Sequence, residues 1–309
     1  YDIRNNLLPM FAESVRDSSL LLIDLGHGKD RLGGSVYSQV TQRFDSVTPD
    51  MEDPKELKKF LELIRSLSAK GAILAYHDRS DGGLAAALCE MMFASHVGVE
   101  IVADALVSKD RTLNQALFNE ELGAVIQVAR GRAAEVERDF EAAGMGWSLK
   151  YLGNLTQDDH LNIYLEGKCV LSEDRVDLQK AWNEVSWQIA RMRDNPECVD
   201  SEYELISDKH NGGLVLTMGF DPEENLAAPF INTGVRPKVA ILREQGVNSQ
   251  NEMASAFLQA GFDAVDVHMT DLLEGRAKLA DFVGLAACGG FSYGDVLGAG
   301  GGWAKTILH

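Results

Sequence analysis

Apolar and polar residues alternate in blocks along the first half of the chain, and each block predicts one helix or one strand. Short apolar runs of strand length occur at 20–25, 72–76, 98–102 and 124–128. Apolar residues recur at helical spacing in four segments between and after these runs: 54–64, 84–92, 112–119 and 132–143. This order predicts an α+β layer in which helices cover one face of a sheet.

The regular pattern fades between residues 194 and 236, where glycine and proline breakers are frequent, and it restarts after Pro237. Beyond that point we predict three strands and one helix, at 238–242, 264–267, 282–287 and 249–260. Strand, helix and strand with short connections are typical of the opening half of a doubly wound parallel sheet. The intervening segment reads as a linker that lies against its neighbours, because its apolar side chains favour cover.

At 309 residues the chain is longer than one typical core supports, which favours about two domains. We divide it into a first domain at 1–193, a linker at 194–236 and a second domain at 237–309. Trp182, Trp187 and Met192 recur at helical spacing and predict packing residues near the end of the first domain. The last residues read as a helix without a terminator, so we expect a fragment of a longer protein.

Composition narrows the classes of function. The net charge of −18 would repel a phosphate backbone, so we expect no nucleic-acid partner. No apolar run approaches the roughly 20 residues that cross a bilayer, and the first residues show no signal pattern, so we expect a cytoplasmic protein. The four cysteines form no C-x-x-C pair, which predicts reduced thiols rather than a zinc site.

The polar loop at 77–83 follows an apolar strand, precedes a helix and combines the groups that phosphoryl chemistry requires. We assign candidate roles to six of its residues, with metal ligands at Asp78 and Asp81, phosphate donors at Arg79 and Ser80, and close backbone approach at Gly82 and Gly83. By spacing alone, the loop also fits a solvated strand-to-helix turn in which Asp81 caps the helix. His77 fits a hydrogen-bonded supporting role beside the loop.

Three further segments carry candidate chemistry that has a structural explanation as well. Glu120 and Glu121 are adjacent carboxylates in 118–123, and such a pair at the end of a helix is usually exposed or caps the helix. A direct ligand role is the alternative. The turn Leu32-Gly33-Gly34-Ser35 is typical of a backbone turn. The glycine-rich segment 298–302 does not directly follow a strand, so it is a weak match to a dinucleotide fingerprint.

Residues 75–84 and 117–128 resemble the second ATP-binding-type lobe of the formylglycinamide ribonucleotide amidotransferase family. By this resemblance Asp78 matches the family's magnesium-binding aspartate and Ser80 its nucleotide-contacting serine. The sequence contains no Walker A motif, and the family binds ATP without one. The resemblance implies the C-terminal lobe of a PurM-like synthetase domain, with Mg²⁺ and ATP as cofactors.

Residues 242–252 and 287–295 resemble the start of the class I glutamine amidotransferase domain of the same family. In that class, backbone N–H groups after the third strand stabilise the oxyanion that forms on the glutamine amide, and the matching residues are Gly289, Gly290 and Phe291. Cys288 ends an apolar strand instead of occupying a Gly-x-Cys-x-Gly elbow, so we do not assign it as the nucleophile. We expect the nucleophile beyond residue 309.

The resemblance implies an ATP-dependent ligase of purine biosynthesis. ATP phosphorylates the amide oxygen of formylglycinamide ribonucleotide, and ammonia from glutamine then displaces phosphate. Formylglycinamide ribonucleotide, glutamine and ATP are the implied partners, and we expect the full-length protein to be a monomer and this chain alone to be inactive. Two alternatives stay open: another ATP-dependent PurM-like ligase and a non-catalytic nucleotide-binding scaffold.

Overall fold

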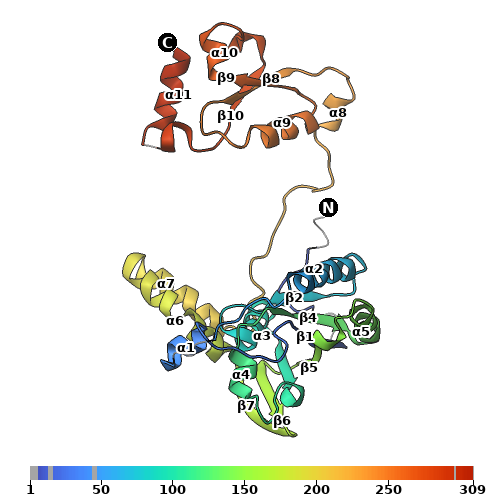
Figure 1. The fold of residues 1–309 in the computed structure, drawn as a ribbon. Coiled ribbons are helices and arrows are strands. Elements are labelled where there is room, and N and C mark those ends of the chain that lie inside the picture. The colour runs from blue at the N-terminus through green and yellow to red at the C-terminus, as the bar shows by residue number, and fades with distance from the viewer. Residues whose placement is uncertain (1–5, 13–16, 44–46, 296, 309) are drawn as a thin grey trace. The chain divides into compact units, whose positions relative to one another are not determined.

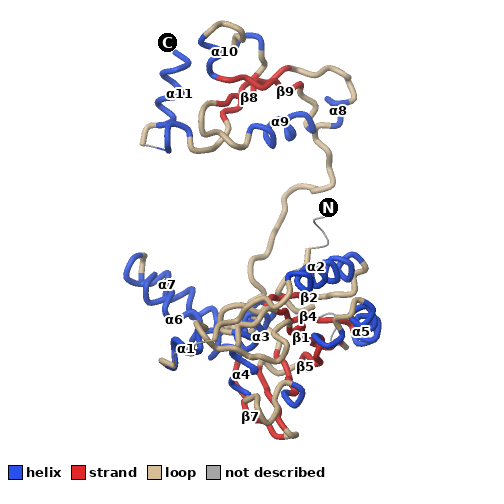
Figure 2. Tube along the Cα trace, in the orientation of Figure 1, coloured by secondary structure: helices blue, strands red, loops and turns tan. Residues whose placement is uncertain are grey.

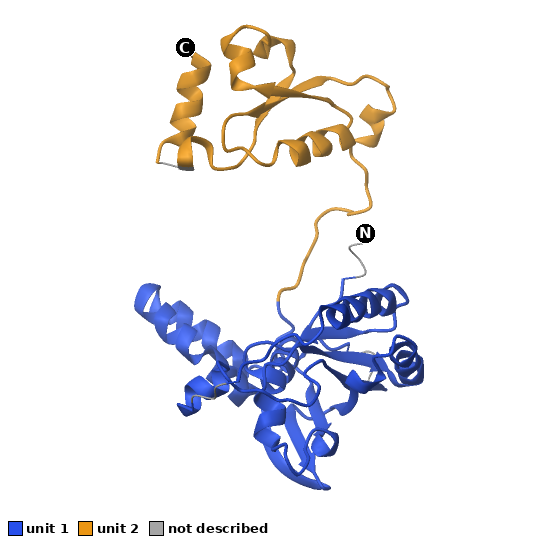
Figure 3. Cartoon of the chain, in the orientation of Figure 1, with its two compact units in different colours: residues 1–213 blue, residues 214–309 orange. Residues whose placement is uncertain are grey.

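The structure is a computed structural model that describes residues 6–12, 17–43, 47–295 and 297–308. The chain divides into two compact units, residues 1–213 and 214–309 (Figure 3). The unit boundary falls later than residue 193 because helix α7, Pro196–Glu204, packs on helix α6, Arg175–Arg193. Trp187 of α6 stacks on Tyr203 of α7 with ring centroids 4.5 Å apart.

Unit 1 is built on one seven-stranded sheet with the order β2-β4-β1-β5-β3-β6-β7 (Figure 1). Its strands are β1 Ser18–Asp24, β2 Ala75–Asp78, β3 Gly98–Val102, β4 Gly123–Ala129, β5 Leu149–Thr156, β6 His160–Leu165 and β7 Lys168–Asp174. Neighbouring strands are antiparallel except for the parallel pair β3 and β6. The remaining helices of unit 1 are α1 Val36–Thr41, α2 Pro54–Ala69, α3 Gly83–Ser95, α4 Leu113–Phe118 and α5 Ala133–Ala142.

Helices cover both faces of this sheet, which corrects the expectation of helices on one face only (Figure 2). Every residue of β1 is buried, and its apolar side chains alternate between two hydrophobic clusters. Leu20 and Leu22 pack with residues of α3 and α4, whereas Leu21 and Ile23 pack with residues of α2 and α5. A continuous apolar run without polar alternation is typical of a strand buried on both sides.

Local capping fixes where the helices of unit 1 begin and end. Asp53 accepts a hydrogen bond from the Lys55 N–H at 2.9 Å, and Pro54 occupies the first turn of α2. The helix ends with Lys70 at its C-cap, and the following Gly71 has φ +61°. The sequence pattern did not predict β5, β6 and β7.

Unit 2 contains a three-stranded parallel sheet, as predicted, and its strand order is β10-β8-β9. Its elements are α8 Ala228–Ile231, β8 Lys238–Arg243, α9 Gln250–Gln259, β9 Asp263–His268, α10 Met269–Leu273, β10 Gly284–Ala287 and α11 Ala299–Leu308. Val239 and Ile241 of the central strand point into one hydrophobic cluster, and Ala240 and Leu242 into another. His309, the last residue of the predicted C-terminal helix, lies outside the described residues.

Among the helices that the structure describes, none combines the length and the apolar character needed to span a bilayer.

Candidate functional site

The predicted phosphate loop connects the end of β2 to the start of α3. Asp78 is the last residue of β2, and its side chain is 68% exposed. Ser80 and Asp81 are exposed as well. The helix-capping alternative for Asp81 is wrong, because Gly82 occupies the N-cap position and no side chain caps the helix. The carboxylates of Asp78 and Asp81 are therefore both accessible at the loop.

The two glycines of the loop serve packing, and their N–H groups already have partners. The Gly82 N–H donates to Glu120 Oε1 at 2.9 Å, and the Gly83 N–H donates to the Ser80 carbonyl oxygen at 2.9 Å. Gly83 has φ +68°, and a Cβ atom there would lie 2.6 Å from the Asn119 carbonyl oxygen. Glycine is required at this position because the first turn of α3 passes so close to the backbone at the end of α4.

Arg79 points into the interior, which corrects its assignment as a phosphate donor in the loop. Its side chain is fully buried, and Nη2 donates to Asp24 Oδ1 at 2.8 Å. Nε donates to the Glu121 carbonyl oxygen at 2.6 Å, and Nη2 also donates to the Leu122 carbonyl oxygen at 3.2 Å. A guanidinium held by a buried carboxylate and two backbone carbonyls is not available at the loop surface.

Asp24, at the end of β1, is the centre of a buried charge cluster. Lys150 Nζ donates to Asp24 Oδ2 at 2.8 Å, and Arg111 Nη2 lies 3.7 Å from the same oxygen. Burial alone would raise the pKa of Asp24, but the charges and hydrogen bonds of Arg79 and Lys150 outweigh it and hold the pKa well below its ordinary value. Asp24 is therefore ionised in the folded protein at neutral pH.

Asp30 adjoins this cluster in the loop that follows β1. Arg111 donates from Nη2 to Asp30 Oδ1 at 2.5 Å, and Asn119 donates to the same oxygen at 3.0 Å. Burial raises the pKa of Asp30 in spite of its contact with Arg111. Asp30 thus connects the loop after β1 to the residue that ends α4.

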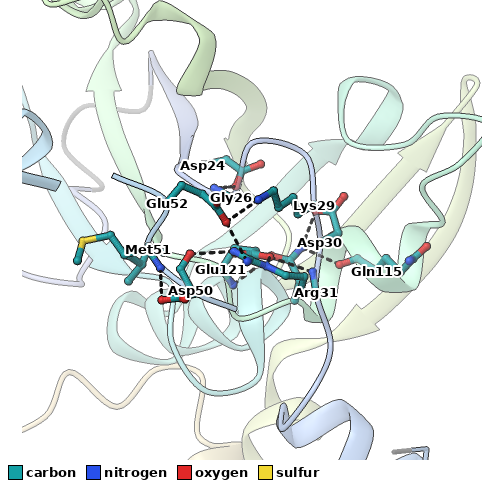
Figure 4. A network of polar contacts seen from close by, with 12 residues as sticks. Asp24, Gly26, Lys29, Asp30, Arg31, Asp50, Met51, Glu52, Gln115 and Glu121 are labelled. Atoms are coloured by element: carbon teal, nitrogen blue, oxygen red, sulfur yellow. Dashed lines mark hydrogen bonds and ion pairs between the residues drawn. The ribbon is translucent and has the colours of Figure 1, made fainter. Parts of the chain in front are cut away.

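A second ion pair holds the same loop to the segment that precedes β4 (Figure 4). Arg31 binds Glu121 through two parallel hydrogen bonds of 2.7 Å, and the Glu121 side chain is 1% exposed. Arg31 Nη1 also donates to Glu52 at 2.9 Å. Of the two adjacent carboxylates in 118–123, Glu121 is therefore a buried structural residue.

Glu120 bridges the starts of two helices. Its Oε1 accepts from the Gly82 N–H before α3 and from the Val36 N–H at the first residue of α1, both at 2.9 Å.

Ser35 caps α1 by accepting from the Ser38 N–H, and Gly33 donates its N–H to the Val47 carbonyl oxygen at 2.8 Å. The segment 32–35 is thus a backbone turn, as the sequence indicated.

His77 supports the loop from within β2. Its Nε2 lies 2.8 Å from Glu90 Oε2 of α3, and its Nδ1 lies 2.8 Å from the Asp78 carbonyl oxygen. Both ring nitrogens therefore contact protein groups, as expected for a supporting residue.

The loop offers two exposed carboxylates, which are ligands of the kind that Mg²⁺ takes. In the described part of the chain, no group of three or more His, Cys, Asp or Glu side chains is placed to hold a metal ion. Mg²⁺ keeps several waters and usually takes one or two carboxylates together with substrate phosphates. The exposed carboxylates of Asp78 and Asp81 fit that pattern, whereas a metal that requires a complete protein cage does not fit.

The predicted oxyanion turn follows β10 in unit 2. The Phe291 N–H donates to the Gly246 carbonyl oxygen at 2.8 Å, so it is already used, and Gly289 and Gly290 remain the candidate donors. Gly290 has φ +144°, and an added Cβ would collide with the backbone of Gly246 and Val247. The turn after β8 therefore packs directly against the candidate oxyanion backbone.

Cys288 lies between β10 and this turn and is 7% exposed. Burial, with a smaller contribution from Asp266, raises the pKa of the Cys288 thiol. A catalytic cysteine requires a lowered thiol pKa and an accessible sulfur. The geometry is thus consistent with leaving Cys288 unassigned as a nucleophile.

Two domain families match this chain. Residues 18–166 match the family described as AIR synthase related protein, C-terminal domain, and residues 236–309 match the CobB/CobQ-like glutamine amidotransferase domain. The chain therefore has the fold of a PurM-like AIR synthase C-terminal domain followed by the start of a glutamine amidotransferase domain. This confirms the predicted fold class.

Solved structures that are similar to parts of this chain at low identity include two Thermotoga maritima PurL structures and a hydrogenase maturation protein. PurLQS from Thermotoga maritima is 13% identical with a TM-score of 0.46, and the match covers 57% of this chain and 28% of that chain. T. maritima PurL complexed with ADP is 12% identical with a TM-score of 0.44, over 84% and 34% of the two chains. HypE, a hydrogenase maturation protein from E. coli, is 20% identical with a TM-score of 0.37, over 52% and 49%. The chain thus spans well under half of the two T. maritima proteins.

Proposed function

We propose that this chain is part of a phosphoribosylformylglycinamidine synthase, a cytoplasmic ATP-dependent ligase of purine biosynthesis (EC 6.3.5.3). The observation that carries the proposal is the order of the two domains, a PurM-like lobe at 18–166 followed by a glutamine amidotransferase domain from residue 236. A ligase that takes its nitrogen from glutamine needs both an ATP-dependent synthetase and a source of ammonia. The two domains supply these two halves on one polypeptide.

In this proposal, the loop between β2 and α3 binds the magnesium-bound phosphates of ATP. Asp78 and Asp81 hold Mg²⁺ through carboxylate oxygens, and Ser80 donates its hydroxyl to a phosphate oxygen. The exposed position of these three side chains supports the assignment. When bound, Mg²⁺ neutralises the charge that develops on the transferred phosphoryl group. The chain's own contribution is to position the phosphates beside the amide oxygen that attacks.

The second half of the reaction belongs to unit 2. The N–H groups of Gly289 and Gly290 stabilise the oxyanion that forms when a thiolate attacks the glutamine amide. Cys288 is buried, so we do not assign it as that thiolate. Ammonia released there displaces phosphate from the activated formylglycinamide ribonucleotide, and the product is the formylglycinamidine ribonucleotide. The ammonia nitrogen becomes the new amidine nitrogen, and the amide oxygen leaves as part of phosphate.

Asp78→Ala is expected to weaken Mg²⁺-dependent ATP binding at least tenfold, because the loop loses one of its two accessible carboxylates. Titration calorimetry of the chain with ATP, in Mg²⁺ and in EDTA, measures the effect. Asp177→Ala is the matched control, because Asp177 is an exposed carboxylate in the first turn of α6 with no function in the proposal. Equal affinities of wild type and Asp78→Ala would remove Asp78 from the site and with it the main residue assignment.

A further inference from the structure

Three loops meet at one end of the sheet, and one of them is the loop between β2 and α3, the candidate ATP loop. One buried side chain, that of Arg79, contacts residues in or next to all three loops. The loops are 25–35 after β1, 79–82 after β2 and 119–122 before β4. Arg79 belongs to the second of these loops. It binds the carboxylate of Asp24, from which the first loop departs, and the carbonyl oxygens of Glu121 and Leu122 in the third.

We infer that Arg79 is a positioning residue, which sets the place of the Asp78 and Asp81 carboxylates by fixing their loop to the two neighbouring loops. The inference rests on the proposed function for its consequence in ATP binding, but the contacts themselves are independent of that function. Arg79 lies between the candidate metal ligands in sequence and points the opposite way in space, since it is fully buried and both aspartates are exposed.

The contacts of Arg79 are directional and therefore suited to positioning. A guanidinium is planar and presents its donors in a rigid fork, so satisfying a carboxylate and two carbonyls at once fixes its plane. The Arg79 backbone N–H also donates to the Gly123 carbonyl oxygen at 2.8 Å, which joins the loop to the start of β4. Both the main chain and the side chain of Arg79 are thus held in place by hydrogen bonds.

The other two loops are fixed to each other by separate contacts. The Glu121 carboxylate binds Arg31 of the first loop, while the Glu121 carbonyl oxygen accepts from Arg79. Glu120 then accepts from the Gly82 N–H, which closes the connection back to the second loop. A displacement of Arg79 should therefore be transmitted to all three loops rather than to its own loop only.

Arg79→Lys tests the inference because it keeps the positive charge and removes the fork. Arg175 is the matched control, because its side chain is equally buried and its Nε donates to Asp159 Oδ1 at 2.7 Å. Arg175 is the first residue of α6, which is remote in sequence from the three loops. Both variants are compared with wild type as the complete chain at a temperature where all are folded. Hydrogen exchange by mass spectrometry follows the three loops, and calorimetry follows Mg²⁺-dependent ATP binding.

For Arg79→Lys, we expect exchange in segments 25–35, 79–82 and 119–122 to accelerate at least tenfold, and the ATP dissociation constant to rise at least tenfold. Arg175→Lys is expected to change neither quantity in these segments. Asp24→Asn should reproduce the effect on the loops. The double variant Arg79→Lys with Asp24→Asn should add little to the exchange of the loops, because both changes remove the contact between Arg79 and Asp24. Should Arg79→Lys fail to fold, Asp24→Asn supplies the same measurement at a temperature where that variant is folded.

Two outcomes would overturn the inference. One is unchanged exchange in the loops of Arg79→Lys, and the other is faster exchange accompanied by unchanged ATP affinity. If the wild-type chain does not bind Mg²⁺ and ATP at all, the proposed function fails. The exchange measurement still tests Arg79 in that case. Faster exchange in all three loops of Arg79→Lys supports its positioning role, and unchanged exchange refutes that role.

Discussion

At pH 7, Asp24→Asn is expected to lower the free energy of unfolding of unit 1 by about 3 kcal/mol or more. Asp24 is 2% exposed and neutralises both Arg79 and Lys150. Removing its charge leaves the buried Arg79 and the partly buried Lys150 without their shared counterion, and breaking a buried ion pair by removing one partner is costly. Urea unfolding followed by tryptophan fluorescence measures the loss, since three of the four tryptophans lie in unit 1.

Asp17→Asn is the matched control for this substitution. Asp17 pairs with Arg130 at 2.6 Å, but its side chain is 82% exposed. Exposed pairs contribute about 0 to 1 kcal/mol, so the control should lose less than about 1 kcal/mol. An equal loss in free energy of unfolding for Asp24→Asn and Asp17→Asn would show that the buried Asp24 carboxylate stabilises unit 1 no more than an exposed one.

The stability difference between wild type and Asp24→Asn should depend on pH, and the direction of that dependence follows from the lowered pKa of Asp24. The pKa of Asp24 is lower in the folded protein than its ordinary value of 3.8, so the folded state binds fewer protons at this group than the unfolded state. The stability from Asp24 is therefore complete above about pH 5 and is lost as the pH falls below about 4. The difference between wild type and Asp24→Asn should shrink over that range, and a difference that stays constant down to pH 3 would contradict the assignment.

Gly83→Ala is expected to destabilise unit 1 by about 3 kcal/mol and to weaken ATP binding at least tenfold. Gly83 combines φ +68° with a backbone approach that leaves no room for a methyl group. The left-handed conformation costs a non-glycine residue roughly 1 to 2 kcal/mol, and overpacking adds about 1 to 3 kcal/mol. Relief of the collision must displace either the start of α3 or the segment at 117–119, and both adjoin the candidate ATP loop.

Gly71→Ala separates the two contributions. Gly71 has φ +61°, yet nothing lies within 4 Å of the position that its Cβ would take. This variant should show the conformational cost alone, about 1 to 2 kcal/mol, with unchanged ATP affinity. If Gly83→Ala is no more destabilising than Gly71→Ala, the close approach at the start of α3 is not essential.

Much of the fold could be predicted from the sequence because its strands are strongly apolar. The strand predicted at 238–242 is β8, and that at 124–128 is β4, each within one residue of the observed ends. By contrast, β7 is an edge strand in which five of seven residues are exposed, so its sequence lacks a clear apolar pattern. Helices on both faces were missed although the continuous apolar run of β1 is itself typical of a strand that is buried on both sides.

The candidate site was predictable in composition but only partly in geometry. The sequence placed Asp78, Ser80 and Asp81 in one loop, and all three are exposed there. It could not show that Arg79 turns inward, because its partner Asp24 lies 55 residues away in an apolar run. Likewise, the Phe291 N–H is used by Gly246, 45 residues earlier, and only the packed turn reveals this. Long-range pairs of this kind leave no local pattern.

Metal rescue is the most direct test that Asp78 binds the magnesium of a bound nucleotide. A soft thiolate in place of the carboxylate prefers a soft ion such as Cd²⁺ over Mg²⁺. For Asp78→Cys, calorimetry should show ATP binding weakened at least tenfold in Mg²⁺ and restored in Cd²⁺, with Asp177→Cys and wild type as references for the native thiols. Restoration specific to Asp78→Cys is the predicted result. Equal ATP affinity of Asp78→Cys and Asp177→Cys in both metals would contradict the account.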